Sequence, residues 1–238
     1  MDHKAFLDGV WKYNDLNEFQ EDYIGFILEP RRVWENLNTI TKKDVKNIVI
    51  EFLRRWKIRN TQRIDPEELK KTLRNLDEYS KLLRHKKILD LDFVEKVGVD
   101  GNNVFNLIKK MYDQTINVHG VGATSASKIL HGINPSIFMM WDTKERLGYG
   151  CAENSVGYLR FLFESQIILR IIVRSCQEEY GSNSEIAEER ILKQANTKRK
   201  MSLSKLLDQY NFMKFTRESN LPDPHNEIFH ICLKRAHL

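Results

Sequence analysis

The segment Gly120-Val121-Gly122-Ala123-Thr124-Ser125 places two glycines around one apolar residue, directly before a run of small residues. Glycine lets the backbone adopt left-handed conformations and approach a ligand closely. A helix beginning at Ala123 would point its first N–H groups outward, with the positive end of the helix dipole behind them. A phosphate oxygen is a natural partner for such donors. The pattern therefore predicts contact with a phosphate backbone, and a tight turn between two core helices is the alternative.

Two helices must position this turn. Apolar residues recur at helical spacing from Val104 to Tyr112, and a second helix over 123–131 would end at Gly132, before Asn134-Pro135. We therefore expect a helix-hairpin-helix over 104–132 and a nucleic-acid contact within 118–142. Val121 would point inward between the helices. The residues predicted to bind DNA are His119, Gly120, Val121, Gly122, Thr124, Ser125 and Lys128.

The segment 120–128, followed by Pro135, Phe138 and Asp142, resembles the signature of the HhH-GPD superfamily of DNA glycosylases. The resemblance covers roughly residues 104–145. It implies that the hairpin holds DNA phosphate and that a nucleotide is flipped into a cleft between two helical subdomains. It also implies that an aspartate beyond the second hairpin helix assists cleavage of the N-glycosidic bond.

Asp142 is the residue that matches this aspartate. It lies 18 residues after Thr124, the fifth residue of the hairpin, and the superfamily aspartate lies at about that interval. Departure of a base leaves positive charge on the sugar, which a nearby carboxylate stabilises, and the carboxylate can also orient an attacking water. The alternative role is capping a helix that begins at Thr143, and the two roles can coexist.

The chain departs from lyase members of the superfamily at Thr124, where those members carry a nucleophilic lysine. Hydrolysis without lyase activity is therefore expected. Lys128 lies one helical turn later and could replace that lysine only if the helix were oriented unusually, so we expect it to pair with phosphate or solvent. Trp141, next to Asp142, is a candidate wall of a base pocket, with core packing as its alternative. Trp56 continues an apolar stripe, and we expect it to be structural.

The sequence gives little indication of a cofactor site. The three cysteines, Cys151, Cys176 and Cys232, form no CxxC pair, so no disulfide framework, zinc site or iron-sulfur cluster is expected. The resemblance implies at most an alkali cation held by hairpin carbonyls in 118–121. His119 could reach a phosphate. Otherwise His119 and His131 are expected to be surface histidines, since neither has a metal-ligand spacing.

The amino-acid composition narrows the classes of partner and location that fit this chain. The chain has 238 residues, 41% of them hydrophobic, a formal net charge of +5 and a pI near 9.0, which favours a polyanionic partner. No apolar run is long enough for a membrane span, and no secretory signal is visible, so we expect an intracellular, monomeric protein. Basic clusters at 54–59, 84–87 and 198–200 are expected to be solvated faces or loops.

Helix signals fill most of the rest. Thr41 and Asp65-Pro66 begin helices that extend to about 56 and 83, and further helices are expected at 154–180, 185–193 and 202–215. The C-terminal tail is less regular. No sheet is predicted. The fold class is all-α, with one domain over 1–238, the hairpin at 104–132, a catalytic-type loop at 133–145 and two helical subdomains around a cleft.

Three functions fit these observations. The first is a DNA N-glycosylase that removes a damaged or mispaired base from double-stranded DNA by hydrolysis through Asp142. The second is a non-catalytic helix-hairpin-helix protein that binds DNA. The third is a helical protein whose partner is another protein. The periodicity does not locate the residues that choose the base.

Overall fold

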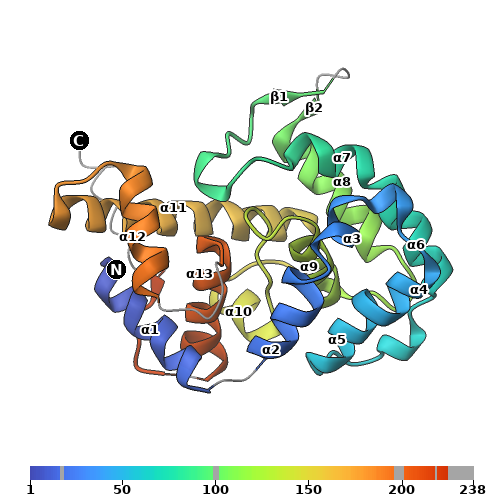
Figure 1. The fold of residues 1–238 in the computed structure, drawn as a ribbon, viewed down its shortest axis with the longest axis horizontal. Helices are drawn as coiled ribbons and strands as arrows, with labels where there is room; N and C mark the ends of the chain where they lie inside the picture. The colour runs from blue at the N-terminus through green and yellow to red at the C-terminus, as the bar shows by residue number, and fades with distance from the viewer. Residues whose placement is uncertain (17–18, 99–101, 196–200, 218, 225–238) are drawn as a thin grey trace.

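The computed structural model describes residues 1–16, 19–98, 102–195, 201–217 and 219–224. Nearly all of the regular structure is helical, which confirms the all-α class (Figure 1). The exception is a short antiparallel pair, β1 (Lys96–Val97) with β2 (Asn102–Asn103), which protrudes from one edge of the fold. Two residues a strand are too few to leave an alternating pattern in the sequence. The basic cluster at 198–200 and the tail from 225 lie outside the described residues.

The N-terminal half consists of short helical segments. These are α1 (His3–Leu16), α2 (Gln20–Tyr23), η1 (Ile24–Leu28), α3 (Arg31–Glu35), η2 (Leu37–Thr39), α4 (Lys42–Asp44), η3 (Val45–Ile50), α5 (Glu51–Arg55), η4 (Thr61–Arg63), α6 (Pro66–Asn75), α7 (Asp77–Leu83) and η5 (Ile88–Asp90).

The helical segments of the C-terminal half include α11 (Ser155–Tyr180), the longest helix among the described residues. The segments of this half are α8 (Val104–Ile116), α9 (Ala123–Ile133), α10 (Thr143–Gly148), α11, α12 (Ser184–Gln194), α13 (Leu203–Asn211) and η6 (Phe212–Thr216).

The predicted helix starts are confirmed, and two of the predicted helices are irregular. Thr41 and Asp44 form a capping box, and the Asp65 side chain accepts from the Glu67 N–H at 2.8 Å. The helix from 41 carries a π-helical stretch, η3, and the helix expected from 65 to 83 is divided at Leu76 into α6 and α7. The buried apolar residues recur on one face across the division, so periodicity alone does not reveal it.

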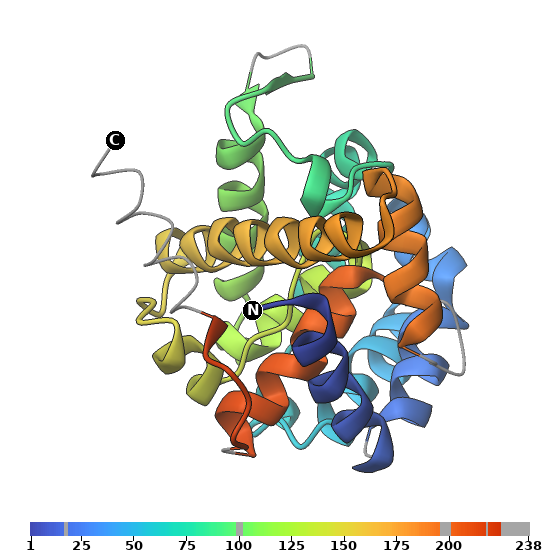
Figure 2. The ribbon, with the colours of Figure 1, turned by 90° about the vertical axis from the view of Figure 1, so that its left-hand side faces the viewer.

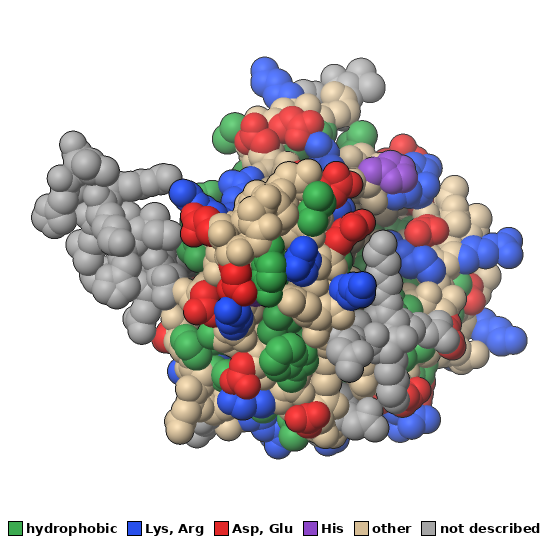
Figure 3. Space-filling view, turned by 60° about the vertical axis from the view of Figure 1, so that its left-hand side comes forward, with side chains coloured by type: hydrophobic (Ala, Val, Ile, Leu, Met, Phe, Trp, Pro, Cys, Tyr) green, Lys and Arg blue, Asp and Glu red, His purple; other side chains and the backbone are tan. Residues whose placement is uncertain are grey.

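The long helix α11 extends across the molecule and contacts α8, α12, α13 and α1 (Figure 2). Its buried side is mainly apolar but also carries Ser165 and Gln166, while Val156 and Phe163 are exposed. The hairpin helices α8 and α9 pack against each other, and α8 also contacts α6. On the face in Figure 3, Lys and Arg side chains are interspersed with Asp and Glu, so neither sign of charge dominates there.

Gly132 lets α3 approach α9 closely. A Cβ at this position would lie 2.6 Å from the Trp34 ring, which is fully buried. The Trp34 indole N–H donates to the Phe26 carbonyl at 2.8 Å, and Arg31 donates to the Gly132 carbonyl at 3.1 Å. The glycine expected to end the helix therefore serves packing, and the helix continues to Ile133.

We expect Gly132→Ala to lower the free energy of unfolding by about 1–3 kcal/mol, because the methyl group would overlap the Trp34 ring. Gly25→Ala is the matched control. Gly25 is an exposed helical glycine with nothing within 4 Å of an added Cβ, so this change should add about 0.5–1 kcal/mol. Urea unfolding measures both. A Gly132→Ala protein as stable as the parent would contradict the packing described.

Candidate nucleic-acid interface

The two hairpin glycines have different roles. Gly120 has a φ of 83°, and a Cβ there would lie 2.7 Å from the carbonyl carbon of Arg63. Gly120 therefore allows close approach to the neighbouring loop of the protein. Gly122 is exposed, has a φ of −96° and would have nothing within 4 Å of an added Cβ. Gly122 is the glycine that leaves open space at the start of α9.

The N-terminus of α9 carries no side-chain cap. Helices α8, α11, α12 and α13 are each capped by the side chain of the residue before them, whereas Gly122 precedes α9. The Ala126 N–H bonds the Gly122 carbonyl at 2.9 Å, so the N–H groups of residues 123–125 precede the first intrahelical bond. These donors, with the positive end of the helix dipole, favour an anion at this position.

A cavity of about 840 Å³ opens in front of this helix end. It lies between the hairpin, the loop over 57–63 and the start of α10. The hairpin residues expected to bind DNA line it, with the exception of Lys128. The basic side chains that line it are Lys57, Arg59, Arg63 and Lys144, and the acidic ones are Asp142 and Glu153.

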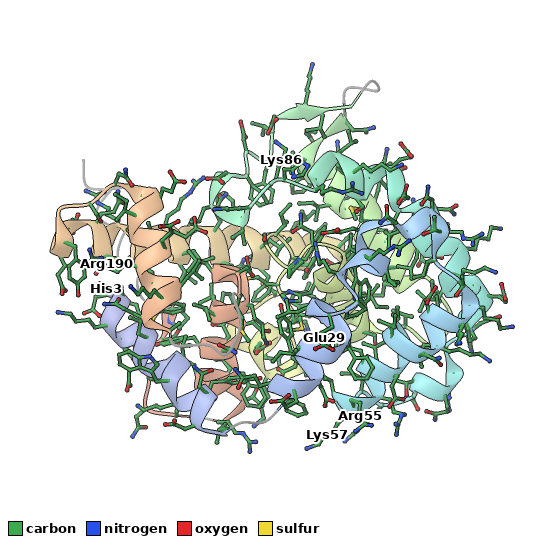
Figure 4. All side chains as sticks on the ribbon, in the orientation of Figure 1. His3, Glu29, Arg55, Lys57, Lys86 and Arg190 are labelled. Carbon is green, nitrogen blue, oxygen red and sulfur yellow. The ribbon has the colours of Figure 1, made fainter. Side chains whose placement is uncertain are left out.

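The loop over 57–60 has an unusual backbone. Lys57 and Asn60 have φ values of 56° and 61°, the left-handed region that few residues other than glycine adopt. Lys57 and Arg59 are exposed, and Figure 4 shows Arg55 and Lys57 directed outward at the edge of the fold. Part of the basic cluster at 54–59 therefore borders the cavity, where sequence reasoning expected only a solvated face.

Asp142 caps α10, as one of its two predicted roles requires. Its Oδ1 accepts from the Glu145 N–H at 2.8 Å, and its own N–H donates to Glu145 Oε2 at 2.9 Å. Its Oδ2 accepts from the Thr216 hydroxyl at 2.8 Å. The carboxylate is half-buried and lines the large cavity, so it is both a structural cap and a group available to a bound molecule.

A second, smaller cavity of about 110 Å³ adjoins the first. Ile58, Thr124 and Asp142 line both cavities, so these three residues form their junction. Its other lining residues are aromatic or ionisable: Tyr13, Phe19, Trp56, Phe212, Lys128, Glu145 and Asp208. We call this the inner cavity. Trp56, expected to be structural, forms part of its wall.

The expectation that Lys128 faces phosphate or solvent is wrong. Its side chain is 7% exposed and lines the inner cavity, because α9 is buried along this face. Lys128 Nζ lies 4.4 Å from the centre of the Trp56 ring and 4.0 Å from Met140 Sδ. Burial lowers the pKa of Lys128, while the nearby Asp208 and Glu145 oppose that shift. Burial, together with the Asp142 carboxylate, raises the pKa of Glu145.

The proposed base-pocket role of Trp141 is also wrong. Trp141 is 1% exposed and lines neither cavity, and its indole N–H donates to the Ala123 carbonyl at 3.2 Å. Tyr112 and Tyr158 meet it edge to face. The alternative role of Trp141, core packing, is therefore correct. Its hydrogen bond holds the first residue of α9, Ala123, against the core.

The two histidines differ from each other. His131, expected at the surface, is fully buried, with its Nε2 2.9 Å from the Tyr23 hydroxyl and its Nδ1 2.6 Å from the Phe138 carbonyl oxygen. Burial lowers the pKa of His131 to about 3. His119 is exposed as expected and lines the large cavity, and its backbone N–H donates to Glu68 at 3.2 Å.

Sequence reasoning missed most of the inner cavity. Tyr13 comes from α1, Phe19 precedes α2, and Asp208 comes from α13, so these residues are far from the hairpin in sequence. The local sequence gave no signal for the charged pair. Lys205 and Asp208 are spaced by three residues on the side of α13 away from its leucines, a pattern typical of a solvent-exposed face, yet both are buried.

No protein-family model, characterised protein or solved structure matches the chain. Within the part of the chain that the structure describes, no helix has the length and apolar character needed to cross a membrane. The geometry of the two adjoining cavities therefore carries the functional proposal.

We expect Gly122→Glu to weaken binding of duplex DNA at least tenfold, because its carboxylate would repel phosphate at the α9 N-terminus. The open space at Gly122 should let the variant fold normally. Fluorescence anisotropy at fixed salt measures the affinity, and circular dichroism checks the fold. Gly122→Ala, which adds no charge, should bind as the parent does. Unchanged affinity in Gly122→Glu would exclude a phosphate contact at this helix end.

Proposed function

We propose that this protein is a DNA N-glycosylase that binds double-stranded DNA through the helix-hairpin-helix and hydrolyses the N-glycosidic bond of a damaged or mispaired base. The observation that carries the proposal is the position of Asp142. It lies at the junction between a basic, solvent-facing cavity and a small cavity walled by aromatic side chains. A flipped nucleotide requires these two environments, one for its phosphates and one for its base.

In this proposal the DNA backbone occupies the large cavity, in the place of the cleft that the resemblance implies. The uncapped first turn of α9 contacts one phosphate, and the basic side chains around the cavity contact its neighbours. Binding of this kind releases counterions, so the affinity must fall steeply as salt is added. An affinity that does not depend on salt would favour a protein partner instead.

The chemistry follows from the position of the sugar at the junction. As the bond from the sugar C1′ to the base nitrogen breaks, the base departs with the electron pair and positive charge develops on the sugar. The Asp142 carboxylate stabilises that charge and orients a water, whose oxygen bonds C1′. The water loses one proton, and the departing base gains one. Hydrogen bonds from the Glu145 N–H and the Thr216 hydroxyl hold the carboxylate in place.

Thr124 also lies at the junction, where lyase members of the superfamily would have a lysine. A hydroxyl cannot form a Schiff base with the sugar, so the proposal is hydrolysis alone.

The second candidate is a protein that binds DNA without catalysis. The observation that favours it is that both carboxylate oxygens of Asp142 accept hydrogen bonds from the protein itself. A carboxylate retained only as a helix cap would have the same contacts.

Asp142→Asn separates the two candidates. Asparagine caps helices as well as aspartate does, so we expect little change in the melting temperature. Without the negative charge, base release should fall at least a hundredfold. The measurement is single-turnover release from duplexes that carry oxidised, alkylated, deaminated or mispaired bases. Asp142→Ala is the structural control and should cost about 1 kcal/mol of stability.

Base release by Asp142→Asn at the parent rate would exclude Asp142 as a catalytic residue. Tight, salt-sensitive DNA binding by the parent without release of any base would favour the non-catalytic candidate.

A further inference from the structure

Lys128 is a buried lysine whose amino group lies over the Trp56 ring, 4.4 Å from its centre, and has no carboxylate partner in the described part of the chain. Among the described residues, no carboxylate oxygen lies within 4.0 Å of its Nζ, and its one hydrogen-bond acceptor is the weak thioether sulfur of Met140. A buried cation without a good acceptor is costly for the folded protein. The position therefore suits an acceptor that enters from outside.

The neighbouring ionisable groups are already engaged with each other. Lys205 Nζ lies 2.5 Å from Asp208 Oδ2, and Glu145 Oε2 accepts the Asp142 N–H. Lys205 and Asp208 neutralise each other, and all of these side chains except Asp142 are more than nine-tenths buried. Of the two lysines in this cluster, Lys128 is thus the one without an oxygen partner, and its side chain lines the inner cavity beside the Trp56 ring.

The depth of Lys128 sets what it can reach. Thr124 lines both cavities, whereas Lys128 lines the inner cavity only. Four residues along α9 correspond to about one helical turn, roughly 5–6 Å further in. A nucleotide with its sugar at Asp142 and Thr124 would extend its base, and not its sugar, toward Lys128.

The walls of the inner cavity suit a flat ring. The Trp56 and Phe19 rings contact each other, with 5.3 Å between their centres, and with Phe212 and Tyr13 they form a continuous aromatic wall against which one face of a ring could pack. Aromatic walls bind a planar heterocycle through its faces and do not distinguish one base from another. Distinction must come from the polar side chains that line this cavity, among which Lys128 has no oxygen partner among the described residues, whereas Glu145 and Asp208 are already hydrogen-bonded.

We propose that Lys128 recognises a carbonyl oxygen on the extrahelical base, so that among damaged bases the oxidised or deaminated ones that carry a keto group are released in preference to those that carry none. This inference rests on the proposed glycosylase function. An N–H donor from an ammonium to a carbonyl oxygen is a charge-assisted hydrogen bond. A base without a carbonyl leaves Lys128 unpaired, and a cationic alkylated base is also repelled by it.

The test compares two groups of substrates in single-turnover base release. The keto group consists of duplexes with one uracil, hypoxanthine or 8-oxoguanine. The other group consists of duplexes with 1,N6-ethenoadenine, and of methylated DNA that carries N3-methyladenine. We expect the parent protein to release bases from the keto group only. We expect Lys128→Met to slow that release by about tenfold to a hundredfold, the usual effect of losing one hydrogen bond to a charged group.

Two further variants keep the test specific. Lys128→Gln retains an N–H donor, so it should recover part of the activity that Lys128→Met loses. Lys144→Met removes a cation from the large cavity alone, so it should weaken binding to all duplexes without changing the base preference. Affinity for an undamaged duplex should stay within about threefold of the parent value in Lys128→Met, since this residue lies away from the phosphates.

The outcomes separate this inference from the function on which it rests. Release of N3-methyladenine or ethenoadenine at rates similar to the keto bases would overturn the role of Lys128 and leave the glycosylase proposal intact. Covalent trapping by borohydride that disappears in Lys128→Met would also overturn it, because Lys128 would then reach the sugar. If no substrate of either group loses its base, the glycosylase proposal itself fails. If Lys128→Met does not fold, the test rests on the parent protein: release from the keto group only would support the role of Lys128, and equal release from both groups would overturn it.

Discussion

The burial of α9 is the constraint on which the candidate site depends. Almost every residue of this helix is buried, and only its N-terminal end reaches open space, at Gly122 and Thr124. The buried Trp141 side chain packs under the protein surface at that end and donates a hydrogen bond to the Ala123 carbonyl. The helix therefore presents backbone donors at one end and carries Lys128 one turn further into the protein. A rigid element holds both groups, so their separation is set by the helix itself.

The N-termini of α9 and α10 border the same cavity, but only that of α10 is capped by a side chain. Asp142 satisfies the first turn of α10 with its own carboxylate, whereas Gly122 leaves the first turn of α9 without a side-chain cap. One end is therefore already occupied by a negative charge, and the other attracts one. In the proposed function, a nucleic-acid phosphate would occupy the second end, and the attached sugar would lie near the carboxylate at the first.

The predictions from sequence succeeded where neighbours along the chain decide the structure. The caps at Thr41 and Asp65, the start of α9 and the long helix α11 follow from local hydrogen bonding and periodicity, and each is confirmed. The predictions failed where burial decides. Lys128 was expected to face outward and His131 to lie at the surface, yet both are buried. Helical periodicity shows that a helix has faces, but α9 is covered on nearly all of them.

The sequence by itself determined the class of fold and the turn between α8 and α9. These depend on contacts within about twenty residues, which local chemistry specifies. The inner cavity was decided only by the tertiary structure. Tyr13 and Asp208 come from near opposite ends of the chain, and both line this cavity together with Lys128. Whether a charged side chain is buried depends on which distant segments cover it, and that is a property of the packed protein and not of its local sequence.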